Sequence, residues 1–381
     1  MTPKRIIDLT ETQVKNNLIE VRRNLLLDFI RGLSILDMMF VHYREYLNLV
    51  PGLNISKLIG YSDFAIEGFT FLAGFLVGSH YFQKFRQQRV QVIKRLVQRS
   101  AELLAIYYIM VFTISLPLVL LLGSSLTGSE TSLVYILRSL LLQNQVGLLH
   151  ILPTFIPLFL LAIPTLYLLE KGYDLIVLAI SIGSFALGHF QPYLLSLGDK
   201  TIFPVVLWQI YFILGILLGK RHISIENRSA KNKYVNLFVA VGTLSVGCFF
   251  YYGHHIYPFM SEIRDGYGIQ VVKFPLNYLG LLYYGSIFFV VFSLTVVFWN
   301  RIQKWKGAVD VVTLFGRHSL LVFIIHVYFA KTLVLTGHIF GNPFPLPQVV
   351  IAANVCTTIA ILGYKEARGS EGKLAVTSLS H

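Results

Sequence analysis

Apolar stretches long enough to cross a lipid bilayer recur along this chain, and they restrict its fold more than any other feature of the sequence. The hydrocarbon core of a bilayer is about 30 Å thick, and about 20 mostly apolar helical residues are needed to cross it. Charged residues make up only 13% of the chain, well below the share usual in soluble domains, so an ordinary soluble enzyme is excluded. We therefore predict an all-α polytopic membrane protein with about ten transmembrane helices, at 25–47, 58–82, 101–122, 151–169, 175–190, 201–219, 234–252, 278–298, 313–335 and 348–363.

The distribution of Lys and Arg predicts how these helices are oriented. If the amino terminus is cytoplasmic, the inner connections hold 23 basic residues and the outer ones 7, with Arg31 and Arg317 left inside helices. Because Lys and Arg are enriched in cytoplasmic loops, this split predicts a multi-pass protein of the cytoplasmic (inner) membrane with both termini inside. The same topology accounts for the net charge of +13 without nucleic-acid binding. We expect a cytoplasmic segment at 1–23, one membrane domain at 24–364 and a cytoplasmic tail at 365–381.

The first predicted helix carries ionisable residues inside a span, where each charged group costs about 2.5–3.5 kcal/mol at the helix centre. At 100° per residue, Asp28, Arg31 and His42 share one face, and Asp37 lies opposite. A rise of 1.5 Å per residue separates Arg31 from His42 by about 16 Å along the axis. Arg31 is therefore expected in the inner half and His42 near the outer surface. Either Asp28 and Arg31 only neutralise each other and His42 is interfacial, or this face has a function.

The second predicted helix places two carboxylates at a similar depth to His42. Asp63 and Glu67 lie in its outer part, on the same face as Gly74 and Gly78. A histidine beside a carboxylate is the arrangement that a general base requires, because the carboxylate fixes the tautomer and stabilises the imidazolium. The spacing of the two glycines by itself indicates close helix packing.

The ninth predicted helix contributes a histidine at membrane depth. Ser319 and His326 lie about 20° apart on one face of it, with His326 expected near the midplane. A core histidine that bonds a neighbouring helix and a catalytic or substrate-contacting histidine are both consistent with this position. The sequence contains no zinc, nucleotide-binding or serine-hydrolase signature.

These residues belong to a set of blocks that run in the same order along a known group of proteins. The chain resembles the acyltransferase 3 superfamily of membrane acyltransferases and, more narrowly, its OpgC-type glucan succinyltransferase branch. The blocks are Asp28, Arg31, Gly32 and His42 in the first helix, Glu67 with the following FTFLAGFLVG, LHILPTFIPL at 149–158, WQIYFILGILLG at 208–219, and GRHSLLVF at 316–323.

The resemblance implies an enzyme that moves an acyl group from cytoplasmic acyl-CoA to a hydroxyl of an extracytoplasmic glycan, among membrane lipids, with no metal. The acyl group is succinyl or acetyl, passed directly or through a covalent histidine intermediate. The implied catalytic residues are His42, its orienting carboxylate Glu67 or Asp63, and His326. The implied contacts of the acyl-CoA are Arg31, with Asp28 holding it in place, and Ser319 and Arg317.

Other functions are also compatible with several helices that carry buried charges. A transporter or flippase for a polar or lipid-linked glycan is one, although carriers often show internal repeats and none is found in this sequence. A sensor or assembly subunit without chemistry is another. The basic stretch at 84–99, with six basic and no acidic residues, is typical of a juxtamembrane helix facing anionic lipid, and direct contact with CoA is its alternative interpretation.

Overall fold

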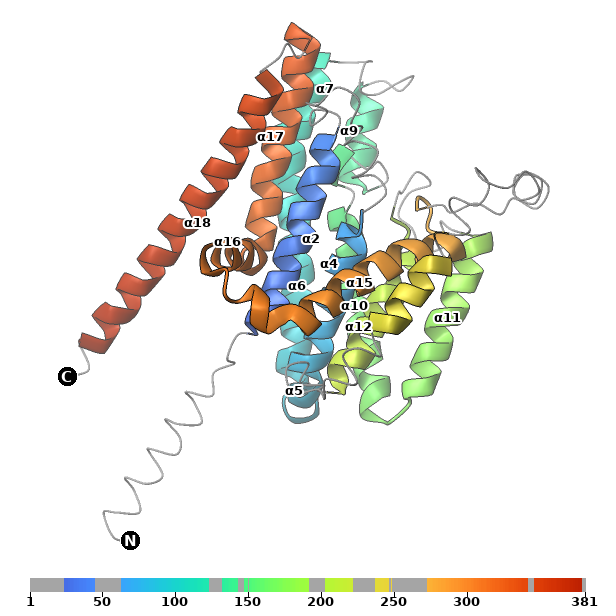
Figure 1. The fold of residues 1–381 in the computed structure, drawn as a ribbon. Coiled ribbons are helices and arrows are strands. Elements are labelled where there is room, and N and C mark those ends of the chain that lie inside the picture. Colours follow the sequence, from blue (N-terminus) through green and yellow to red (C-terminus); the bar gives the residue numbers. More distant parts are fainter. Residues whose placement is uncertain are drawn as a thin grey trace.

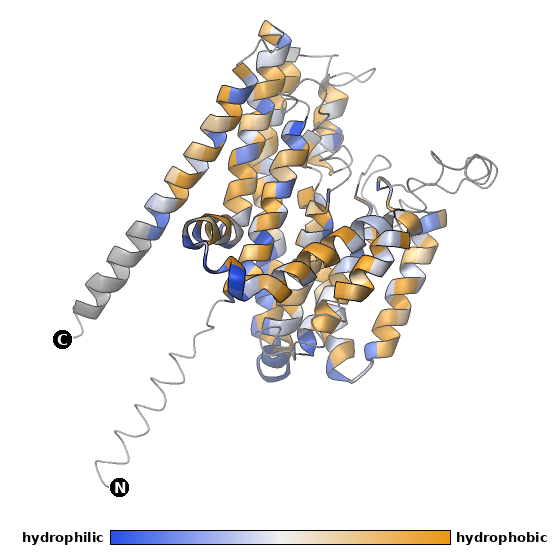
Figure 2. Cartoon of the chain, in the orientation of Figure 1, coloured by the Kyte–Doolittle hydropathy of each residue, from blue (hydrophilic) through white to orange (hydrophobic). Residues whose placement is uncertain are grey.

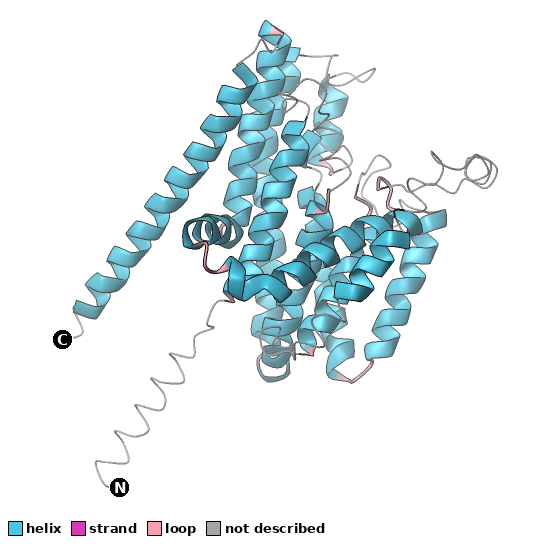
Figure 3. Ribbon diagram, in the orientation of Figure 1, coloured by secondary structure: helices cyan, strands magenta, loops and turns pink. Residues whose placement is uncertain are grey.

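The protein is a bundle of helices (Figure 1). The computed structural model describes residues 24–44, 63–122, 132–142, 147–149, 151–191, 203–221, 237–246, 248, 273–341 and 346–378. Within these ranges there is no strand (Figure 3), which confirms the predicted all-α class. Five helices in this part of the chain are long and apolar enough to cross a membrane, namely Arg89–Leu121, Ile151–Glu170, Tyr278–Ile302, Ser319–Phe340 and Leu346–Glu366.

Helix α2 lies in the middle of the bundle and packs against α4, α15, α16 and α17. The elements in chain order are α2 (Leu25–Tyr43), α4 (Ala65–Leu76), η2 (Val77–Tyr81), α5 (Phe82–Gln87), α6 (Arg89–Met110), η3 (Val111–Ser115), α7 (Leu116–Leu122), α9 (Ser132–Leu140), η4 (Gly147–Leu149), α10 (Ile151–Glu170), α11 (Asp174–Phe190), α12 (Val205–Lys220), α15 (Tyr278–Ile302), α16 (Lys306–Arg317), α17 (Ser319–Phe340) and α18 (Leu346–Ser378). A further short apolar helix spans Leu237–Val246.

Each of the ten predicted ranges contains a helix, but three of their boundaries are wrong. The third helix starts at Arg89, because the basic stretch is helical and continues through α6 and η3 into α7. The predicted ninth helix, 313–335, is two helices, because the chain turns at His318 between α16 and α17. The tenth continues through Ser378, beyond the predicted end at 363, because hydropathy detects only the apolar part of a helix.

Two glycines bring α2 and α16 into backbone contact. A Cβ atom on Gly32 would overlap the carbonyl oxygen of Val312, and one on Gly316 would overlap that of Asp28. The two helices can therefore cross this closely only because both positions lack a side chain. This contact sets α16 across α2, where Figure 1 shows it almost end-on.

Four glycines bring α12 into backbone contact with the helix formed by α4 and η2. Cβ atoms on Gly74 and Gly78 would overlap backbone oxygens of α12, and those on Gly215 and Gly219 would overlap backbone oxygens of α4. The pattern is two glycines four residues apart on each helix, which is a common motif for close packing in membranes. The packing interpretation of Gly74 and Gly78 is confirmed.

The outside of the bundle is apolar where lipid would lie. Figure 2 shows hydrophobic residues along α11 and α15, and hydrophilic ones around α5 and at the end of α15. Large apolar side chains of α11, such as Ile176, Ile180 and Phe190, are exposed. An exposed apolar face of this extent is typical of contact with hydrocarbon rather than water. The stretch 132–149, predicted to lie on or in the outer surface, contains α9 and η4.

Candidate active site

One face of α2 lines two cavities. Arg31, Ile35, Met38 and His42 follow each other at spacings of three and four residues, which puts them in one stripe along the helix. Arg31 and Ile35 line a cavity of about 490 Å³, which we call the Arg31 cavity. His42 lines a second one of about 550 Å³, the His42 cavity, and Met38 lines both. The predicted shared face of Arg31 and His42 is present, with its two ends in different cavities.

His42 is paired with the second candidate histidine. Its Nδ1 lies 2.8 Å from Nε2 of His326, and the two rings stack with centroids 5.0 Å apart. His42 lines the cavity, whereas His326 is fully buried behind it. If Nδ1 of His42 carries the proton and donates it to His326, Nε2 of His42 is unprotonated, as a general base requires. The sequence named both histidines but not their contact, because 283 residues of chain separate them.

A buried network holds the histidine pair in place. The Tyr43 hydroxyl donates to the carbonyl oxygen of His326 at 3.2 Å and accepts from the Asn354 amide at 2.7 Å. The Thr358 hydroxyl donates to the Asn354 side chain at 3.3 Å. All of these side chains are buried, so α2, α17 and α18 are joined by hydrogen bonds that water does not compete for.

The two predicted carboxylates are bound by a lysine. Nζ of Lys273 lies 2.8 Å from Asp63 and 3.2 Å from Glu67, and 4.6 Å from the ring centre of Tyr284. Burial disfavours the charged ammonium, but attraction to the two carboxylates outweighs it and raises the pKa of Lys273 above its usual value. We call Lys273, Asp63 and Glu67 the ion cluster.

The structure does not bring these carboxylates into hydrogen-bond contact with His42. Asp63 lines the His42 cavity, so it shares a space with the histidine. Glu67 is fully buried, and among the described residues its carboxylate accepts a hydrogen bond from Lys273. Asp37, on the opposite face of α2 as predicted, accepts a hydrogen bond of 2.8 Å from the backbone N–H of Phe64 at the start of α4. That acceptor satisfies a helix-terminal donor and attaches α4 to α2.

The Arg31 cavity is rich in cations. Arg95 and Arg99 of α6 line it together with Arg31, and Ser319 contributes from the first residue of α17. Arg99 pairs with Glu102 at 3.0 Å, and Arg95 has no ion-pair partner among the residues that the structure describes. Two of the six basic residues in the stretch 84–99 therefore reach a cavity.

Arg31 is fixed from two sides. It lies 3.7 Å from Asp28, one helical turn earlier, and donates to the carbonyl oxygen of Gly316 at 3.4 Å. Asp28 also lies 3.8 Å from Nε of Arg317. Asp28 thus stands between two guanidinium groups, as expected of a residue that holds Arg31 in place, and α16 supplies the second contact.

The residues predicted to contact acyl-CoA form two groups in the structure. Arg31 and Ser319 line the Arg31 cavity. Arg317 instead points to α18, where it contacts Glu366 at 3.3 Å, and His318 lies 3.5 Å from the same carboxylate. Arg317 therefore connects α16 to α18 and reaches the cavity through Asp28.

Sequence analysis missed three side chains that shape the site. Lys273 lies in a predicted loop, Tyr43 directly follows His42, and Asn354 is an amide within an apolar stretch of α18. An amide inside a predicted span was a usable signal, since uncompensated polar groups are costly there. Nothing local indicated the partners of these residues.

The fold and site together define an all-helical membrane protein with a histidine pair at one of two cavities that share the face of one helix. The family described as OpgC protein matches residues 23–368, so the chain belongs to this family. Membership implies a transferase activity and a glucan-modifying function of the acyltransferase kind. No curated protein and no solved structure matches the chain.

Proposed function

We propose that this protein is an integral membrane O-acyltransferase of the acyltransferase 3 superfamily, which moves an acyl group from cytoplasmic acyl-CoA to a hydroxyl of an extracytoplasmic glucan. The observation that carries the proposal is the stripe on α2, where a cation at one end and a histidine at the other line two cavities that share Met38. A reaction with its donor on one side of the membrane and its acceptor on the other needs such an arrangement.

The donor belongs in the Arg31 cavity. CoA is polyanionic at its nucleotide end, and a guanidinium binds phosphate through two parallel hydrogen bonds. Arg31 of α2 and Arg95 and Arg99 of α6 supply three such groups around the cavity, where Glu102 pairs with Arg99. In the orientation that the charge distribution predicts, this cavity is the one nearer the cytoplasm. The acyl end of the donor would then extend along α2 toward His42.

The transfer step belongs to His42. The acceptor oxygen attacks the thioester carbonyl carbon while the imidazole of His42 takes the hydroxyl proton. The carbon–sulfur bond then breaks, and the CoA thiolate takes the proton back from the imidazolium. His326 holds the imidazole through Nδ1, and Asp63 lines the same cavity. A covalent acyl-histidine route would use the same nitrogen of His42 as the nucleophile.

A second cation favours an acidic acyl group over a neutral one. Lys331 lines the His42 cavity and makes no ion pair among the residues that the structure describes. An ammonium in a partly buried cavity is a binding group for a carboxylate. A succinyl group carries such a carboxylate at its far end and an acetyl group does not. We therefore propose succinyl as the donor group that Lys331 recognises.

The test is donor-dependent esterification of glucan by the purified protein in detergent. Radiolabelled succinyl-CoA and acetyl-CoA are offered with glucan oligosaccharides, and base-labile label on the oligosaccharide is counted. We expect transfer with wild type, at least 100-fold less with His42→Ala, and unchanged transfer with His338→Ala, an exposed histidine on the same helix as His326. Lys331→Met should lower succinyl transfer more than acetyl transfer. Glucan movement across a vesicle membrane without any acyl donor, and no ester formed, would contradict the proposal and favour a carrier.

A further inference from the structure

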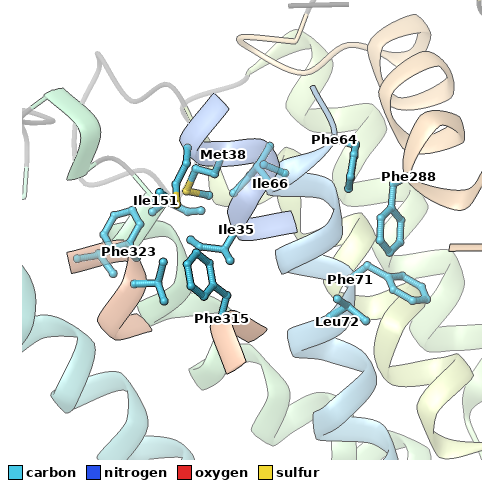
Figure 4. Packing of buried hydrophobic residues seen from close by; sticks show 14 of the residues in the cluster. Ile35, Met38, Phe64, Ile66, Phe71, Leu72, Ile151, Phe288, Phe315 and Phe323 are labelled. Carbon is cyan, nitrogen blue, oxygen red and sulfur yellow. The ribbon is translucent and has the colours of Figure 1, made fainter. Parts of the chain in front are cut away.

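The two cavities along α2 meet at three apolar side chains. Met38 of α2, Ile151 of α10 and Phe323 of α17 each line both cavities. All three are buried, and Figure 4 shows them converging from separate helices. We call these three residues the neck. A group that passes from one cavity to the other by the path along α2 has to pass between them.

Cationic side chains lie on both sides of the neck and none belongs to it. Arg31 and Arg95 line the cavity on one side of it, and His42 and Lys331 line the cavity on the other. The neck itself carries no polar side chain. An ionised group that enters it loses its hydrogen bonds to water, so a succinyl carboxylate crosses the neck against a barrier and is bound again by Lys331 on the far side. The neck therefore separates two polar compartments.

The three side chains of the neck differ in conformational flexibility. Met38 is unbranched and flexible, so it can change rotamer to widen the passage. Phe323 is rigid, and its ring also meets that of His326 edge-on, with centroids 5.5 Å apart. Moving Phe323 would thus disturb the histidine pair, whereas moving Met38 would not. Phe323 is therefore bulkier and less adaptable than Met38.

We propose that the acyl end of the donor passes through the neck and that Phe323 determines how large an acyl group reaches the histidine pair. This inference rests on the proposed acyl transfer and adds a specificity-determining residue to it. A single methylene in an apolar pocket changes discrimination by about 10- to 200-fold, so a change in ring size at this position has a measurable effect.

The experiment compares transfer from acetyl-, butyryl- and hexanoyl-CoA by purified variants. Phe323→Leu, which keeps an apolar side chain and protects against misfolding, should raise the ratio of hexanoyl to acetyl transfer by about 10-fold or more. Phe323→Trp should lower transfer from all three donors while CoA binding is kept. The matched control is Phe340→Leu, at an exposed position of α17 that lines neither cavity, and it should leave the ratio unchanged.

An unchanged ratio in Phe323→Leu together with normal transfer by Phe323→Trp would overturn the inference. A wild type that transfers no acyl group from any donor would overturn the proposed function instead. The neck is then judged from proton leak into proteoliposomes, read with a pH-sensitive dye. Met38→Ala combined with Phe323→Ala should leak faster than wild type if the neck separates the compartments, and equal leak would contradict it.

Discussion

Two buried polar clusters lie near the same end of α2, and they differ in what they leave available for chemistry. In the ion cluster, the ammonium of Lys273 is matched by the carboxylates of Asp63 and Glu67. In the histidine pair, His326 is buried behind His42, and His42 lines a cavity. Both clusters were candidates for the same mechanism on sequence grounds. Their surroundings differ, because His42 lines a cavity, as a reacting group must, whereas Glu67 and Lys273 are buried and paired with each other, as structural groups are.

The comparison predicts that removing one side chain has different consequences in the two clusters. Removing one member of a buried ion pair leaves an uncompensated charge and lowers the free energy of unfolding. Removing one member of the histidine pair leaves a neutral ring and changes the tautomer and orientation of the other. The first change should therefore reduce stability, and the second should reduce rate.

The largest effect is expected at His326. His326→Ala removes the acceptor for Nδ1 of His42, and we expect acyl transfer to fall by about 10²- to 10⁴-fold in a protein that still folds. His326→Gln can accept the same hydrogen bond and should restore part of the rate. Purified variants are compared for initial rate across a range of pH, because a lost partner should also shift the pH–rate profile of His42. Equal rates and profiles in wild type and His326→Ala would make His326 a packing residue.

Lys273→Met should cost about 3–5 kcal/mol of unfolding free energy, because it leaves the buried Glu67 and the partly buried Asp63 without a counter-ion. Adding Glu67→Gln to that variant removes one of those charges and should recover part of the loss. Unfolding is followed by denaturant titration in detergent micelles. The exposed Lys304 provides the control, since Lys304→Met should change stability little. A stable Lys273→Met protein with lost transfer would place Lys273 in the reaction and end the distinction between the clusters.

A smaller effect is expected where α4, which carries Glu67, packs against α12. Gly74→Ala forces a Cβ atom into the backbone oxygen of Phe212 and should lower the unfolding free energy by about 1–3 kcal/mol. Gly183→Ala on α11 meets no neighbouring atom and should be neutral or slightly stabilising. Thermal denaturation of the two variants in detergent makes the comparison. Similar behaviour of both would show that α4 and α12 are not in backbone contact.

An effect of similar size is expected at Tyr43. Tyr43→Phe removes a hydroxyl that donates to His326 and accepts from Asn354, so the unfolding free energy should fall by about 1–3 kcal/mol, with a modest loss of rate. Asn354→Leu combined with Tyr43→Phe removes both partners and should be less destabilising than the two single losses added together. Additive losses would mean that the two side chains do not interact.

How far the site could be read from sequence depended on whether a feature is local. Periodicity along one helix placed Arg31 and His42 on one face and Asp37 opposite, and both placements are present in the structure. The glycine spacing on α4 likewise predicted close packing, because a missing side chain matters whatever the partner is.

Features that depend on partners from distant parts of the chain could not be predicted from the sequence. Glu67 and His42 were matched by depth alone, and nothing in the sequence indicated that Lys273 would take the carboxylate. Helix α16 was also missed, although the polar residues Arg317, His318 and Ser319 interrupt the apolar sequence where the chain turns into α17. Depth and hydropathy describe a residue relative to the membrane and contain no information on which helices are neighbours.

The central claim is a division of labour along α2, and binding and transfer measured on the same preparations test it most directly. CoA affinity and acyl transfer to glucan are measured in detergent for wild type, Arg31→Lys and His42→Ala. Lysine keeps the charge at position 31 and loses the bidentate geometry, so Arg31→Lys should weaken CoA binding. His42→Ala should bind CoA almost as wild type does and fail in transfer. Loss of CoA binding in His42→Ala, together with normal binding and transfer in Arg31→Lys, would contradict the account.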